Sequence, residues 1–171
     1  MIDSSMSISG QRTADNRDVL MADLNHGVAL YMLVDGSSSR VQSGEFAKHL
    51  AESIQHSFQA LTPEQLSPSK IKETLIGLLK TSQQSLKQTY PAASASLNMV
   101  AIMGSVGLVL HLGDCLLGRL NKSSNIKWLT QPHCHQGHLE IETLALIPER
   151  NLLTKSAKAR RFESPQWKVI A

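Results

Sequence analysis

An aspartate and a glycine end a short apolar segment near the beginning of the chain. Residues 28–34, VALYMLV, form a continuous apolar run, and Asp35-Gly36 and three serines follow it. A run of this length with these flanks predicts a buried strand. Asp, Gly and Ser are all turn formers, so an ordinary surface turn could follow the strand. The alternative is a strand end that presents a carboxylate and a bare backbone carbonyl to a metal ion.

Two further segments contain similar residue types. A polar stretch, GQRTADNRD, runs from Gly10 to Asp18, before the apolar run. Gly113-Asp114 separates two later apolar runs, where we expect the turn of an antiparallel hairpin. Asp-Gly and Gly-Asp pairs are frequent in turns, so neither segment is specific alone. Their order along the chain carries more information.

Two helices are expected to follow the first strand. Apolar residues recur at helical spacing between residues 46 and 58, and Ser43 is placed to cap the beginning of that helix. A second helix is predicted over 68–90, with Pro68 at its first position and Pro91 after its end.

The second half of the chain changes to the pattern of strands. Three apolar runs, 97–103, 106–112 and 115–120, are separated by glycine-containing pairs. Further short strands are expected at 126–130 and from 166 onward. The order strand, helix, helix, strands predicts an α+β fold with helices on antiparallel sheets, not a doubly wound sheet.

The composition limits the class of protein. The 171 residues are 42% hydrophobic and 18% charged, with a formal net charge of +3, which suits a single domain over 1–171. The basic residues near the C-terminus are not interleaved with aromatic residues, so no nucleic-acid partner is expected. No signal peptide and no apolar run of about 20 residues is present, so no membrane contact is expected. With two cysteines and no disulfide framework, we expect a cytoplasmic protein.

A cluster of potential zinc ligands lies in the segment HCHQGH, residues 133–138. Zinc coordination needs about four such ligands, and no second pair stands at a standard spacing. The pattern therefore favours a polar loop over a zinc site.

In their order, the segments from residue 8 to residue 135 resemble the metal-dependent protein serine/threonine phosphatases of the PPM, or phosphatase 2C, type. The counterparts are the polar stretch 10–18, Asp35-Gly36, the two helices, ASLNMVAIMG, Gly113-Asp114-Cys115 and LTQPH at 129–133. The resemblance implies an antiparallel β-sandwich flanked by helices. It also implies two Mg²⁺ or Mn²⁺ ions held by oxygen ligands, and a bridging water that attacks phosphoserine or phosphothreonine.

Roles follow from the resemblance by position. Asp35 would bridge the two metal ions, and the Gly36 carbonyl would ligate one of them. Asp18 would hold a metal-bound water. Gly113 and Asp114 would be structural residues of a hairpin.

The chain departs from the family pattern at several of these positions. The phosphate-binding arginine of the family corresponds to Thr13, and Arg12 stands one residue earlier, which in an extended segment turns its side chain to the other face. Arg17 replaces an acid and would weaken cation binding through its charge. Ser37, Ser38 and Ser39 replace a glycine-containing segment, and Ser38 lacks the conformational freedom of glycine.

Two further metal-binding acids of the family have no counterpart, and the chain stops where the first of them would follow. The sequence therefore predicts a truncated domain that lacks the C-terminal part of the family domain, with too few ligands for two ions. We expect a catalytically deficient, protein-binding or regulatory signalling module that recognises a phosphoprotein or regulatory partner. The alternative is an active Mg²⁺- or Mn²⁺-dependent phosphatase with a non-standard metal site. Open sheet edges favour a homodimer.

Overall fold

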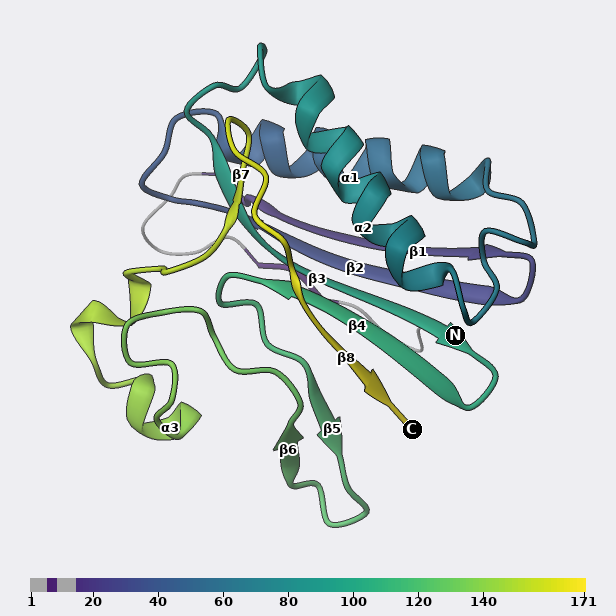
Figure 1. The fold of residues 1–171 in the computed structure, drawn as a ribbon. Helices are drawn as coiled ribbons and strands as arrows, with labels where there is room; N and C mark the ends of the chain where they lie inside the picture. The colour runs from purple at the N-terminus through teal and green to yellow at the C-terminus, as the bar shows by residue number, and fades with distance from the viewer. Residues whose placement is uncertain (1–5, 9–14) are drawn as a thin grey trace.

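The structure is a computed structural model and describes residues 6–8 and 15–171 (Figure 1). Its main sheet has the strand order β1-β2-β3-β4-β8, and β7 pairs with β3 at one end. All of these pairs are antiparallel. A second sheet consists of the two-stranded hairpin β5–β6. The strands are β1 (Asp18–Asn25), β2 (Val28–Gly36), β3 (Ser94–Met103), β4 (Val106–Leu112), β5 (Gly118–Leu120), β6 (Ile126–Trp128), β7 (Ala157–Lys158) and β8 (Gln166–Ile170).

Two long helices cover one face of the main sheet. Helices α1 (Ser43–Gln59) and α2 (Ile71–Leu86) lie together on that face, and the β5–β6 hairpin and the short helix α3 (Ile141–Leu144) lie on the other (Figure 1). A 3-10 turn spans Pro148–Asn151. The predicted α+β architecture, antiparallel strands with flanking helices, is confirmed.

The core lies between the helices and the sheet because side chains alternate along each strand. On β2 the residues Val28, Leu30, Met32 and Val34 point towards the helices, and each is at most 4% exposed. The apolar stripe of α1 packs against them, with Phe46, Leu50, Ile54 and Phe58 fully buried. We call this side of the sheet the helix-side face.

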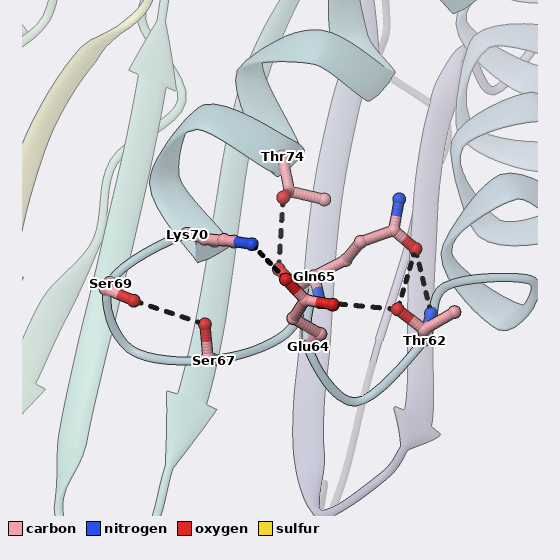
Figure 2. Close-up of polar contacts among 7 residues, drawn as sticks. All are labelled: Thr62, Glu64, Gln65, Ser67, Ser69, Lys70 and Thr74. Carbon is pink, nitrogen blue, oxygen red and sulfur yellow. Dashed lines mark hydrogen bonds and ion pairs between the residues drawn. The ribbon is translucent and has the colours of Figure 1, made fainter.

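The connection between α1 and α2 is fixed by its own polar residues rather than by the expected proline start (Figure 2). The Thr62 amide donates to the Gln65 side chain at 2.9 Å, and Thr74 Oγ1 donates to the Gln65 carbonyl at 3.0 Å. An ion pair joins Lys70 and Glu64. The chain turns through 67–70, so α2 begins at Ile71, three residues after the predicted position.

Several expected details of the elements are wrong. Strand β1 is not among the predicted elements, although it pairs with β2 along its whole length. Ser43 is the first residue of α1 and not its cap, because its Oγ accepts a hydrogen bond from the Ser94 amide at 3.2 Å. Gln42, in a left-handed conformation with φ of 58°, precedes the helix instead.

The strand after Gly113-Asp114 also differs from the expectation. The predicted apolar run 115–120 forms only the three-residue strand β5, which pairs with β6 and not with β4. The strand beside β4 is β8. Gly113-Asp114 is therefore not a hairpin turn but the point where the chain leaves the main sheet. Within the described residues, no helix is both long and apolar enough to span a lipid bilayer.

Candidate functional site

Three carboxylates gather at one corner of the main sheet, and we call Asp18, Asp35 and Asp114 the acid corner. Asp18 and Asp35 are direct cross-strand partners on β1 and β2, so their side chains lie on the same face, opposite the helices. Ser96 is the partner of Asp35 on β3. Its hydroxyl donates to Asp114 Oδ1 at 2.6 Å, which brings the third carboxylate to the same corner.

The electrostatics of the acid corner favour a shared proton. The pKa of Asp35 is raised from its ordinary value of 3.8 to about 7, first by burial and then by the negative charges of Asp18 and Asp114. A hydrogen bond with Asp18 adds to the shift. Because neighbouring like charges oppose ionisation, the Asp18–Asp35 pair retains a proton close to neutral pH.

Two glycines let neighbouring backbone approach the acid corner. A Cβ on Gly36 would lie 2.4 Å from the Ser43 carbonyl oxygen, so the beginning of α1 packs directly onto the end of β2. Gly113 has φ of 89°, and a Cβ there would lie 2.2 Å from Ser96 Oγ. Both positions therefore require glycine for close packing, whatever the role of the Gly36 carbonyl.

The Arg17 side chain binds an acid of its own segment and the loop after β2. Its guanidinium pairs with Asp15 at 3.0 Å and donates to the Ser37 carbonyl at 3.1 Å. The Arg17 side chain thus reaches the serine loop and the beginning of α1, and the expectation that its charge weakens cation binding stays a prediction. Ser38 has no positive φ, so the loop does not need glycine there.

Arg12, the candidate phosphate ligand, and Thr13 lie outside the described residues. The other predicted site residues are Asp18, Asp35, Gly36, Gly113 and Asp114, and the structure brings them to one end of the main sheet. Ser96, the β3 register partner of Asp35 whose hydroxyl donates to Asp114, is not among the residues that the sequence predicted. No local pattern marks Ser96, because its position depends on the pairing of β3 with β2 and on the segment after β4.

A histidine pair lies beside the acid corner. The rings of His111 and His133 stack with centroids 4.4 Å apart. Burial, and then the neighbouring His133, lower the pKa of His111 to about 4, and burial lowers the pKa of His133. His133 Nδ1 accepts from the Gly113 amide at 3.1 Å, so the neutral ring donates from Nε2 to Gln166. These contacts tie the 129–133 segment to the main sheet.

The two cysteines are free and buried. Burial, and then the charges of Asp35, Asp114 and Asp18, raise the pKa of the Cys115 thiol, so it remains protonated and is a poor nucleophile. Cys134 forms an isolated bridge with Leu153.

The acid corner contains oxygen atoms that could serve as ligands of a metal ion. Carboxylate and carbonyl oxygens suit a hard cation such as Mg²⁺ or Mn²⁺. Nevertheless, among the described residues no group of three or more His, Cys, Asp or Glu side chains is arranged to hold a metal ion, in the histidine segment or elsewhere. The residues in place are of the right kind but do not fit a two-metal centre.

Comparison with solved structures identifies the fold. A bacterial serine phosphatase superimposes with a TM-score of 0.82 at 18% identity, and the match covers 96% of this chain and 70% of that one. The S. agalactiae serine/threonine phosphatase superimposes with a TM-score of 0.80 at 22% identity, and the match covers 96% of this chain and 72% of that one. The catalytic domain of the phosphatase PstP, solved with two manganese ions, gives 0.68 at 15% identity, covering 96% and 70%.

The chain therefore has the fold of the bacterial PPM-type serine/threonine phosphatases, as the sequence predicted. It spans about 70% of their length. No protein-family model matches the sequence, and no curated protein is detectably similar to it in sequence.

Proposed function

We propose that this chain is a phosphatase-2C-like domain that is deficient in phosphoester hydrolysis and works as a protein-binding or regulatory signalling module. The observation that carries the proposal is the donor set of the acid corner: among the described residues, no group of three or more His, Cys, Asp or Glu side chains is arranged to hold a metal ion. A centre with two divalent cations needs several oxygen ligands for each ion, and the described residues of the acid corner do not supply them.

The partner proposed is a phosphoprotein or a regulatory protein in a cytoplasmic setting, with no nucleic acid and no membrane involved. The two free cysteines fit a reducing compartment. The exposed serines after β2, Ser38 and Ser39, offer hydroxyl hydrogen-bond donors to such a partner without any hydrolysis.

Manganese binding and hydrolysis, measured on the same preparation, test the proposal. Titration calorimetry with Mn²⁺ and a phosphoserine peptide hydrolysis assay would be run on the wild type, on Asp35→Asn, and on Asp23→Asn as a control from the opposite face of β1. We expect weak Mn²⁺ binding and no turnover above the buffer rate in all three proteins.

The competing function is an active Mg²⁺- or Mn²⁺-dependent phosphatase with a non-standard metal site. The convergence of Asp18 and Asp35 on one face favours it, because that pair is the beginning of such a site. Turnover that depends on Mn²⁺, disappears in Asp35→Asn and survives in Asp23→Asn would establish this alternative and reject catalytic deficiency.

A further inference from the structure

A group of basic side chains lies where helix α2 meets the segment that joins β7 to β8. Lys80, Lys87, Arg160 and Arg161 are all exposed, and we call these four residues the basic surface. In the sequence the two arginines belong to a basic stretch near residue 160, and the two lysines stand more than 70 residues earlier. The fold brings the two pairs together on the helix side of the molecule.

Side-chain contacts hold the segment 158–162 against α2. The Gln83 side chain, which is 1% exposed, donates from Nε2 to the Lys158 carbonyl at 3.2 Å. The Lys80 ammonium lies 5.9 Å from the centroid of the Phe162 ring, within the range of a cation–π interaction. Packing therefore sets the position of the segment beside the helix, and like charges are held together although they repel one another.

Two of the cations share a shallow depression of the surface. Lys87 and Arg160 line it together with Gln88 and Pro91. Lys80 and Lys87 are seven residues apart, and the backbone is still helical at Lys87, so both side chains leave the same side of the helix. Their positions differ by about 10 Å along the helix axis. The positive charge is therefore spread along a row instead of being concentrated at one point.

Acidic side chains do not neutralise this row. Among the described residues, no ion pair involves any of the four members of the basic surface. The sequence contains no Asp or Glu over 74–113, and Glu163 is the only acid over 150–171. Glu163 pairs with Lys158 at 2.9 Å, and its side chain is only 20% exposed. The basic surface therefore keeps its charge in the folded chain.

Structural roles account for only part of the basic surface. Lys87 caps the C-terminal end of α2, where a cation is favoured by the helix dipole, and Lys80 covers the Phe162 ring. Arg160 has no comparable role, because among the described residues its guanidinium forms neither a hydrogen bond nor an ion pair. An exposed arginine in a depression beside a lysine is suited to bind an anion from outside the chain.

We propose that the basic surface docks an acidic peptide segment of a partner protein, with several Glu or Asp side chains in succession. The inference rests on the proposed function, because it gives the partner of a protein-binding module its chemistry. An extended peptide rises about 3.3 Å per residue, so carboxylates about three residues apart match the spacing of Lys80 and Lys87. A row of carboxylates can meet all four cations, whereas a single small anion meets only some of them.

Other polyanions fit this surface less well. The exposed positions beside the lysines are Thr81, Gln84 and Gln88, so α2 presents no large apolar side chain that would enter a membrane. Single strands of nucleic acid are normally held by stacking on accessible aromatic rings. Here the Phe162 ring is half-buried and Tyr90 is 6% exposed. The polar surroundings therefore favour a peptide.

Fluorescence anisotropy with a labelled peptide tests the surface. The probe carries a run of consecutive glutamates between Gly-Ser spacers, and the same peptide with glutamines is the uncharged control. We expect saturable binding of the glutamate peptide at about 0.1 M salt, weaker binding at about 0.5 M because salt screens the charges, and no binding of the glutamine peptide. The wild-type chain is used throughout as the reference.

Charge-reversal variants separate a site from a general effect of net charge. Lys87→Glu/Arg160→Glu should raise the dissociation constant of the glutamate peptide about tenfold. Lys122→Glu/Lys127→Glu is the matched control, because it changes the net charge equally at two exposed lysines of the β5–β6 hairpin. It should change the dissociation constant less than about threefold. Circular dichroism verifies folding, and the milder Lys87→Gln/Arg160→Gln should weaken binding in the same direction.

Three outcomes overturn the proposal. The first is a wild type that does not bind the glutamate peptide, and the second is an equal loss of affinity in the two charge-reversal variants. The third is tighter binding of an oligothymidine of equal charge, or of phosphatidylglycerol vesicles, since the surface would then serve another polyanion. The probe contains no phosphate, so its binding does not depend on the hydrolysis assay. Mn²⁺-dependent turnover would thus reject catalytic deficiency and leave the docking result to stand by itself.

Discussion

The two faces of the main sheet are built from the same strands but differ in how they are covered. On β2 the helix-side residues are buried under the helices. Tyr31 and Leu33, on the opposite face of the sheet, which we call the open face, are only half-buried. The difference shows that the apolar pattern of β2 predicts burial on both faces, although the described residues fully bury only the helix-side face. The three carboxylates of the acid corner lie on the side of the sheet that the helices do not cover.

The largest expected effect on stability comes from replacing leucines of β2 with alanine, first on the helix-side face and then on the open face. Leu30→Ala, on the helix-side face at 1% exposure, should lower the free energy of unfolding by about 3 kcal/mol, because it leaves a cavity under α1. Leu33→Ala, three residues along β2 on the open face, should cost about 1 kcal/mol, since its surroundings are already partly solvent. Urea denaturation at low protein concentration measures both. Equal losses would show that the open face is as well packed as the core.

An intermediate effect is expected from the acid corner and its pH dependence. The folded-state pKa of Asp35 lies above the unfolded value of 3.8, so the folded protein binds more protons between about pH 4 and pH 7. The stability contributed by this protonation is complete below pH 4 and is lost as the pH rises through 7. Asp35→Asn should abolish this loss of stability. At about pH 8 its free energy of unfolding should exceed that of the wild type by about 1–2 kcal/mol, after allowance for partial solvent access.

The measurement is the free energy of unfolding of the wild type and Asp35→Asn across that pH range. Asp23→Asn serves as the control, because Asp23 lies on β1 but faces the helices, where it accepts from the Gln59 side chain at 2.9 Å. Parallel profiles for the wild type and Asp35→Asn would contradict the shared proton.

The parts of the fold that could be predicted from sequence are those with a strong local pattern. The continuous apolar run of β2 and the Gly104-Ser105 break between β3 and β4 specify a buried strand and a hairpin within a few residues. Strand β1 was not predicted because Asp23 interrupts the apolar residues on its helix-side face. Asp23 is accommodated there by a long-range contact, the hydrogen bond from the Gln59 side chain at the end of α1.

The remaining errors involve partners distant in the chain. A hairpin at Gly113-Asp114 was a reasonable expectation from local sequence, but β4 is paired by β8, near the end of the chain. For the site, the resemblance located Asp18 and Asp35, which the register then placed side by side. The Ser96–Asp114 contact depends on how β3 and the segment after β4 pack, which no local pattern specifies.

The smallest effect on the unfolding free energy is expected from an exposed residue of β1. The same substitution tests whether the melting temperature depends on protein concentration. Leu20→Thr, on the face of β1 opposite the helices at 42% exposure, introduces a β-branched strand former and should change the unfolding free energy of the dilute protein by less than about 0.5 kcal/mol. If a second copy covers this face, the wild-type melting temperature rises with protein concentration by mass action, and Leu20→Thr reduces that rise. Differential scanning calorimetry over a dilution series measures it, with Leu152→Thr, 55% exposed in the segment after the 3-10 turn, as the control. A wild-type melting temperature that does not change with concentration would mean that no second copy covers this face.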